Sequence, residues 1–125
     1  MKKRILVVDD EISVVDALQD MLTVYGYEVF TVNRGDKVFE QIVKCQPDLI
    51  LMDIMLAGMD GRTISRALRA IDSTSNIPII LLSGGNYEAE NTLRQSAADD
   101  FMHKPFDMYE LINKINSRLS AAQSV

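Results

Sequence analysis

The sequence predicts a doubly wound α/β fold, in which helices cover both faces of a parallel sheet. Short apolar runs recur along the chain, with the length and continuity of strands that are buried on both faces. Each run is followed by a segment whose apolar residues recur every three or four positions, which is the period of an amphipathic helix. This alternation indicates parallel strands joined by right-handed helical crossovers.

Length and composition indicate one soluble globular domain. The chain has 125 residues, of which 47% are hydrophobic, and a net charge of −5. We expect a single domain over residues 1–125 with its core at about 4–119. The only basic cluster, residues 2–4, is too small to indicate direct nucleic-acid binding. Cys45 is the single cysteine and no apolar run has transmembrane length, so a cytoplasmic protein without a membrane partner is expected.

The expected strands are short apolar runs bounded by acids or turn residues. They cover residues 5–8, 28–32, 49–53, 78–83 and 101–103. The first run is followed directly by acids, and the third run ends in one. Pro78 stands at the first position of the fourth strand, where a missing N–H group does least harm.

The expected helices cover residues 11–25, 36–45, 62–72, 88–97 and 107–119. The apolar stripes of the first three are Val14, Leu18, Leu22 and Tyr25, then Val38, Ile42 and Cys45, then Ile64, Leu68 and Ile71. Gly26 and Pro47 end the first two helices. Cys45 is therefore expected to be a buried structural thiol rather than a nucleophile.

The remaining segments are expected to be loops and one capped helix. Residues 54–61 are predicted to form a loop, and residues 84–86 a turn that leads into the weaker fourth helix. Asp107 and Glu110 have the spacing of a capping box for the last helix. The apolar stripe of that helix is Leu111, Ile112, Ile115 and Leu119.

Five alternating strands favour the flavodoxin-like strand order 2-1-3-4-5, whose switch point lies between the first and third strands. Asp9, Asp10 and Asp53 would meet there. Each like-charged pair of carboxylates at roughly 4 Å repels by about 4 kcal/mol, so either one is protonated or a cation lies among them. Hard oxygen ligands with few direct carboxylates are typical of a Mg²⁺ site. The alternative is that these acids only cap helices or loops, a role that Asp10 could fill.

Ser83 and Lys104 follow the fourth and fifth strands at the same edge of the sheet. The hydroxyl can donate a hydrogen bond, and the ammonium suits a phosphoryl oxygen. An acidic cluster flanked by a donor and a cation is typical of phosphoryl transfer, with Asp53 as the nucleophile that forms an aspartyl phosphate.

These residues also resemble the motifs of a known family, the receiver domains of two-component response regulators, including the chemotaxis regulators. The matching motifs are Val7-Val8-Asp9-Asp10-Glu11, Leu51-Met52-Asp53 with Met59-Asp60-Gly61, Ile80-Leu81-Leu82-Ser83, and Ala98-Asp99-Asp100-Phe101 with Lys104-Pro105-Phe106. The resemblance spans about residues 4–119. It implies a cytoplasmic phosphoprotein of phosphorelay signal transduction.

The resemblance implies that Asp53 accepts a phosphoryl group from a histidine kinase or a histidine phosphotransfer protein. Asp10, Asp53 and the backbone carbonyl of Met55 would bind Mg²⁺ directly, and Asp9 mainly through water. Such a domain is not an enzyme acting on other molecules, but it assists its own phosphorylation and dephosphorylation.

The resemblance also implies a conformational switch. Ser83 would bond a phosphoryl oxygen, Lys104 would pair with it, and Phe101 would turn inward as Ser83 moves. The Lys104–Pro105 bond would be cis. The signal would reach a downstream effector, or a second copy in a homodimer, through the fourth helix, fifth strand and fifth helix at about residues 88–119.

Several positions depart from the family pattern. Ala57 replaces a usual proline, which predicts a less rigid loop, and Ala97 replaces a common glycine, which costs roughly 1 kcal/mol if φ is positive there. Met55 and Gly85 flank the phosphate position and offer no side chain to orient water. The adjacent glycines 84 and 85 also predict a mobile loop after Ser83.

Three other functions remain as alternatives for these residues. A phosphatase of the haloacid-dehalogenase type would need two acids spaced D-x-D, whereas Asp9 and Asp10 are adjacent. A flavodoxin would need a phosphate-binding loop where acids stand here. A docking module that is never phosphorylated is the third. Residues 120–125 leave no room for an output domain, so we expect a stand-alone regulator or a piece of a longer protein.

Overall fold

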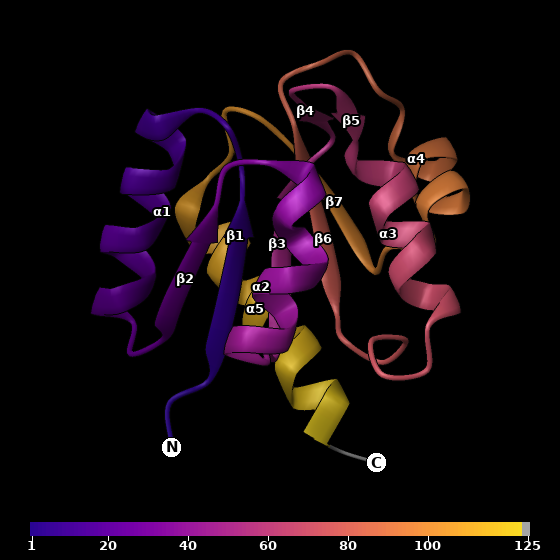
Figure 1. Cartoon of the computed structure of the whole chain (residues 1–125). Coiled ribbons are helices and arrows are strands. Elements are labelled where there is room, and N and C mark those ends of the chain that lie inside the picture. The colour runs from indigo at the N-terminus through magenta and orange to yellow at the C-terminus, as the bar shows by residue number, and fades with distance from the viewer. Residues whose placement is uncertain (124–125) are drawn as a thin grey trace.

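The computed structural model of the chain describes residues 1–123 and has a central parallel sheet with helices on both faces (Figure 1). The strands of this sheet are β1 (Arg4–Val8), β2 (Glu28–Val32), β3 (Leu49–Asp53), β6 (Ile79–Ser83) and β7 (Asp100–His103). Their order is β2-β1-β3-β6-β7, and all neighbours are parallel. Since β4 and β5 lie outside this sheet, the predicted order 2-1-3-4-5 is confirmed.

The helices follow the strands in the predicted alternation. They are α1 (Ile12–Val24), α2 (Val38–Cys45), α3 (Gly61–Ala70), α4 (Ala89–Ser96) and α5 (Met108–Gln123), with a 3-10 turn, η1 (Gly35–Lys37), before α2. Most of the expected bounds lie within two residues of the observed ones, which is the usual uncertainty of helix termini. The last helix is the exception, since it was expected to end at residue 119 and continues to Gln123. None of the described helices has the length and apolar character needed to span a membrane.

The sheet separates two apolar layers. In β1, Leu6 and Val8 pack toward α2 and α3, whereas Ile5 and Val7 pack toward α1 and α5. Figure 1 shows α2 and α3 in front of the sheet and α5 behind it. Every residue of β3 and β6 is buried, because these central strands are covered on both faces. This coverage explains their uninterrupted apolar sequence.

Two of the expected inward residues are exposed instead. The Ile71 prediction was wrong: the residue is 41% exposed. Helix α3 ends at Ala70 and Ile71 is extended, while the Thr74 hydroxyl donates to the Leu68 carbonyl at 2.6 Å and caps that end of the helix. Tyr25 is 46% exposed because it is the C-cap residue of α1, after the last helical turn.

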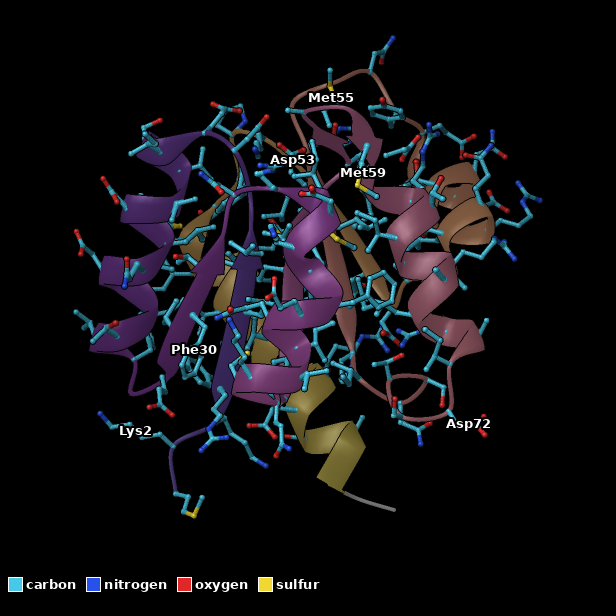
Figure 2. The ribbon with its side chains drawn as sticks, in the orientation of Figure 1. Lys2, Phe30, Asp53, Met55, Met59 and Asp72 are labelled. Carbon is cyan, nitrogen blue, oxygen red and sulfur yellow. The ribbon has the colours of Figure 1, made fainter. Side chains whose placement is uncertain are left out.

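The segment predicted as a loop, residues 54–61, contains a small antiparallel hairpin. It pairs β4 (Met55–Leu56) with β5 (Met59–Asp60), and Gly58 in the turn has a φ of 75°. Strands of two residues are too short for the alternation that identifies a strand in a sequence. Figure 2 shows Met55 and Met59 on this hairpin at the same end of the molecule as Asp53, and Asp72 at the opposite end.

Non-glycine residues with left-handed backbone end α2 and α4. Ala97 has a φ of 57° at the end of α4, so the condition for its steric cost relative to glycine is met, and Gln46 has a φ of 47° at the end of α2. At the start of α5, Asp107 Oδ1 accepts from the Glu110 N–H at 3.0 Å and caps the helix. This bond is one half of the predicted capping box.

Candidate functional site

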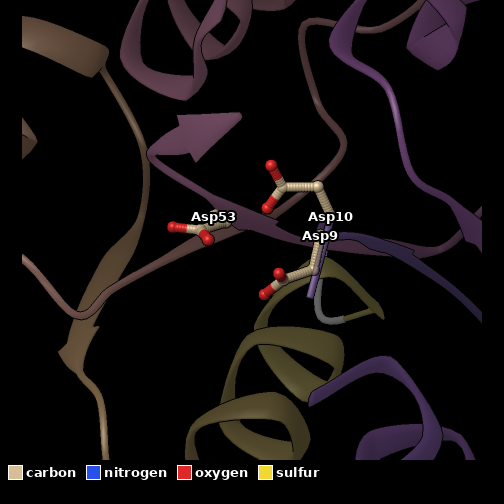
Figure 3. Close-up of side chains that lie close together, drawn as sticks. All are labelled: Asp9, Asp10 and Asp53. Carbon is tan, nitrogen blue, oxygen red and sulfur yellow. The ribbon is translucent and has the colours of Figure 1, made fainter. Parts of the chain in front are cut away.

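The site lies where β1 and β3 end side by side. Val8 is paired with Met52 in the register of the two strands, so Asp9 and Asp53 follow at the same edge of the sheet. One carboxylate oxygen of Asp9, Asp10 and Asp53 lies within 4.8 Å of each of the others. Figure 3 shows the three side chains converging from these two strand ends. The predicted meeting of the three acids is therefore present in the structure.

Backbone N–H groups orient the two buried carboxylates. Asp9 Oδ1 accepts from the Glu11 N–H at 2.9 Å, and Asp53 Oδ1 accepts from the Met55 N–H at 3.1 Å. Asp9 is 1% exposed and Asp53 is 3% exposed, whereas Asp10 lies at the surface. The capping role considered for Asp10 is not what the structure has: Glu11 is the N-cap residue of α1, and its end has no side-chain cap.

Lys104 joins the buried carboxylates. Its Nζ lies 2.8 Å from Asp9 Oδ2 and 3.0 Å from Asp53 Oδ2, and 3.4 Å from Glu11 Oε1. The Lys104 N–H donates to the Ser83 carbonyl at 2.7 Å, which places the base of the side chain at the end of β6. The Lys104–Pro105 bond is cis, as the resemblance implied.

Two pKa values in this cluster are raised, for different physical reasons. Burial raises the pKa of Asp9, and its hydrogen bond to Lys104 offsets this only in part. Burial alone would lower the pKa of Lys104, but its hydrogen bonds to Asp9 and Asp53 outweigh burial and raise it. Both groups thus hold their protons more tightly than they do in water, Asp9 because it is buried and Lys104 because it has two carboxylate partners.

Ser83 and Phe101 lie close to this edge. In the register of β3 and β6, Asp53 is paired with Leu82, so Ser83 is the next residue along the neighbouring strand. Ser83 is fully buried, and its Oγ accepts from the Gly85 N–H at 2.9 Å. Phe101 is 8% exposed, and its ring lies edge-on to that of His103 with centroids 4.7 Å apart.

Two residues that contribute to the site had no assigned role in the sequence. Glu11 supplies a third carboxylate to Lys104. Gly61 begins α3 directly against the end of β3: a Cβ on this glycine would lie 2.3 Å from the Asp53 carbonyl oxygen. The Asp60-Gly61 pair was visible as a motif, but only the structure shows that a side chain at Gly61 would displace the residue that carries the Asp53 carboxylate.

The donor set suits a hard divalent cation. Asp9, Asp10 and Asp53 offer carboxylate oxygens only, two of these residues are buried, and Asp10 is open to water. Mg²⁺ is bound in proteins by one or two carboxylates with water in the remaining positions. The residues present therefore fit Mg²⁺, and a cation there would relieve the repulsion among the three acids.

The chain matches the response regulator receiver domain family over residues 5–116. It belongs to this family. The DNA-binding response regulator MtrA of Mycolicibacterium paratuberculosis is 36% identical over 120 residues, which are 95% of this chain and 52% of that protein. The receiver domain thus spans about half the length of the curated relatives that it matches.

Solved structures agree in fold. The BeF3-activated N-terminal receiver domain of Klebsiella pneumoniae RstA is 30% identical, with a TM-score of 0.85, and the match covers 94% of this chain and 98% of that one. The receiver domain of the sensor histidine kinase PA1611 of Pseudomonas aeruginosa is 27% identical with a TM-score of 0.85, covering 96% and 99%. That structure has a magnesium ion coordinated in its active site cleft. The predicted flavodoxin-like fold and receiver-domain family are both confirmed.

Proposed function

We propose that the Asp53 carboxylate of this receiver domain accepts a phosphoryl group from a phosphohistidine on a histidine kinase or a histidine phosphotransfer protein. The observation that carries the proposal is the position of Asp53 within one cluster of two further acids and an ammonium, at the carboxyl edge of a parallel sheet. Ligands of such folds bind at this edge.

In the transfer, an oxygen of Asp53 attacks phosphorus, and the P–O bond forms as the P–N bond of the phosphohistidine breaks. The histidine leaves with the electron pair of that bond. Lys104 already contacts Asp53 Oδ2 and would compensate the charge of the phosphoryl oxygens. Mg²⁺ held by Asp9, Asp10, Asp53 and the Met55 backbone carbonyl would neutralise charge on the carboxylates and the phosphoryl group.

Phosphorylation would shift the domain between two conformations. Ser83 would exchange its present contact with the Gly85 N–H for a bond to a phosphoryl oxygen, and Phe101 would follow it as the second switch residue. The surface formed by α4, β7 and α5 would then present the signal to an effector or to a second copy in a homodimer.

The remaining properties follow from the same proposal. The domain would act in the cytoplasm as a single unit over residues 1–125, with neither a membrane nor nucleic acid as its direct partner. It would promote its own phosphorylation and dephosphorylation without turning over other substrates. Neither Met55 nor Gly85 would orient the hydrolytic water through a side chain.

Acetyl phosphate with Mg²⁺ tests the proposal without a cognate kinase. Intact-mass measurement should show one added phosphoryl group on the native chain, none on Asp53→Asn, and one on the surface control Asp20→Asn. Full labelling of Asp53→Asn would overturn the assignment. If the native chain takes up no phosphoryl group from acetyl phosphate or from phosphorylated histidine donors, the domain serves only for docking.

A further inference from the structure

Arg62 connects three parts of the molecule next to the site. It lies in the first turn of α3, and its guanidinium forms an ion pair with Asp60 in β5 at 2.6 Å. Its Nη1 donates to Gln95 Oε1 of α4 at 2.9 Å. The same guanidinium lies 4.8 Å from the centroid of the Tyr87 ring, in the segment between β6 and α4. The Arg62 side chain is 27% exposed, so these partners enclose most of it.

The Tyr87 ring lies against Gly85. A Cβ on Gly85 would be 2.7 Å from Tyr87 Cε2 and 3.3 Å from Met55 Sδ, so the ring and the methionine occupy the space over this glycine. The Gly85 N–H donates to Ser83 Oγ. A continuous series of contacts therefore runs from Arg62 through Tyr87 and Gly85 to the switch hydroxyl. The mobility expected of the two glycines stays a prediction, but the second glycine is held by neighbours.

We propose that Arg62 is a positioning residue for Ser83: by holding Tyr87 over Gly85, it stabilises the unphosphorylated position of the Ser83 hydroxyl. This inference rests on the proposed phosphorylation of Asp53. Because Ser83 must leave the Gly85 N–H to bond a phosphoryl oxygen, Arg62 opposes that movement and slows phosphorylation. Asp60 anchors the guanidinium, and the ion pair lowers the pKa of Asp60, so the anchor is charged at neutral pH.

Arg66 provides a matched comparison on the same helix. Its Nε donates to the Gln95 carbonyl at 2.6 Å and its Nη2 to the Arg94 carbonyl at 2.7 Å. Arg66 therefore binds backbone carbonyls at the end of α4, whereas Arg62 binds the Gln95 side chain of the same helix. Both of these bonds go to α4, and neither reaches the segment before that helix. A variant at Arg66 should weaken the α3–α4 contact without releasing Tyr87.

Phosphorylation by acetyl phosphate with Mg²⁺ tests the inference. A cation–π contact that is partly open to water is worth enough to change a rate about two- to fivefold, and Arg62→Gln should be phosphorylated faster by that factor. Tyr87→Leu should be accelerated likewise, since the ring is lost while Asp60 keeps its partner. Tyr87→Phe retains the ring and should react at the native rate, as should Arg66→Gln.

Hydrogen exchange of the unphosphorylated proteins gives a second readout. Backbone amides of residues 84–88 should exchange faster in Arg62→Gln and Tyr87→Leu than in the native chain, while amides of β3 and β6 remain protected and show that the variants are folded. Native rates and native exchange in both variants, or equal acceleration in Arg66→Gln, would overturn the inference. Absence of labelling in the native chain would instead refute the proposed function, and the exchange data would still decide whether Arg62 holds the segment.

Discussion

The Lys104 ammonium lies 3.0 Å from Asp53 Oδ2, although 51 residues separate the two in the chain. The same nitrogen lies 2.8 Å from Asp9 Oδ2. One cation therefore connects the ends of three strands, and among residues 1–123 it is the only group of opposite charge that forms an ion pair with either of these buried carboxylates. The arrangement couples the stability of the fold to the charge of the site.

Replacing Lys104 with methionine should destabilise the domain by about 3 kcal/mol in the absence of divalent ions. The substitution leaves two buried carboxylates without a counter-charge, which costs far more than losing a surface ion pair. Added Mg²⁺ should recover part of the loss, because a cation among the acids replaces some of the missing charge. Urea unfolding of the native and variant chains, each with EDTA and with MgCl₂, measures both effects.

Lys114→Met is the control for that experiment. Its Nζ is 3.8 Å from Asp100 Oδ1 near the surface, and such a pair contributes about 1 kcal/mol or less. The loss of stability in Lys114→Met should be the same with and without Mg²⁺. A Lys104→Met variant as stable as Lys114→Met in EDTA would contradict the account of the charge cluster.

The raised pKa of Asp9 predicts how stability varies with pH. In the folded chain Asp9 binds its proton more tightly than in the unfolded chain, where its pKa is about 3.9. The free energy of unfolding contributed by this group is therefore highest below that value, and it falls as pH rises through the raised folded pKa. Asp9→Asn lacks this contribution, so its stability relative to the native chain should increase with pH across that window. Lys104 stays protonated there, since its pKa is also raised.

Urea titrations in EDTA at a series of pH values from about 4 to 8 compare the two chains across this window. Asp20→Asn, an exposed acid on α1, should follow the native curve. If the stability of Asp9→Asn relative to the native chain stays constant or decreases with pH, the pKa of the buried carboxylate is not raised.

The sheet and the acidic cluster were predictable for a common reason. Central parallel strands such as β3 are buried on both faces, so they are continuous apolar runs, and the carboxyl ends of parallel strands lie at one edge. A carboxylate directly after such a run must therefore lie at that edge. Asp9, Asp10 and Asp53 could be placed together from their positions in the sequence alone.

The features that were not predicted depend on contacts between segments far apart in the chain. The end of α3 before Ile71 depends on the Thr74 hydroxyl, and the exclusion of a side chain at Gly61 depends on the Asp53 carbonyl. Arg62 stands at the start of an expected helix, and its contact with Tyr87 appears only when the segment before α4 is in place. Local periodicity carries no information on these contacts.

Ala97→Gly should stabilise the domain by about 1 kcal/mol. Ala97 ends α4 with a φ of 57°, a conformation that glycine adopts without the steric cost of a Cβ. Thermal and urea unfolding measure the change. Ala70→Gly at the end of α3 is the matched control, and it should destabilise because this alanine is helical. If both glycine variants lose stability equally, backbone strain at Ala97 is negligible.

Gly61→Ala tests the packing of α3 against the residue that carries the Asp53 carboxylate. The added Cβ would lie 2.3 Å from the Asp53 carbonyl oxygen and 3.0 Å from the Ile54 Cα, and both are backbone atoms that cannot rotate away. The end of β3 or the start of α3 must therefore shift. We expect a loss of about 1–3 kcal/mol in the free energy of unfolding, as for other overpacked sites.

The same substitution should also weaken Mg²⁺ binding, since a shift of the β3 end moves Asp53 relative to Asp9 and Asp10. The increase in unfolding temperature on adding Mg²⁺ reports this binding, because a ligand that binds the folded chain stabilises it by mass action. Gly84→Ala is the control: nothing lies within 4 Å of a Cβ at that position, and its stability and its response to Mg²⁺ should be close to native. A native response to Mg²⁺ in Gly61→Ala would mean that the strand end keeps its position and that the helix moves instead.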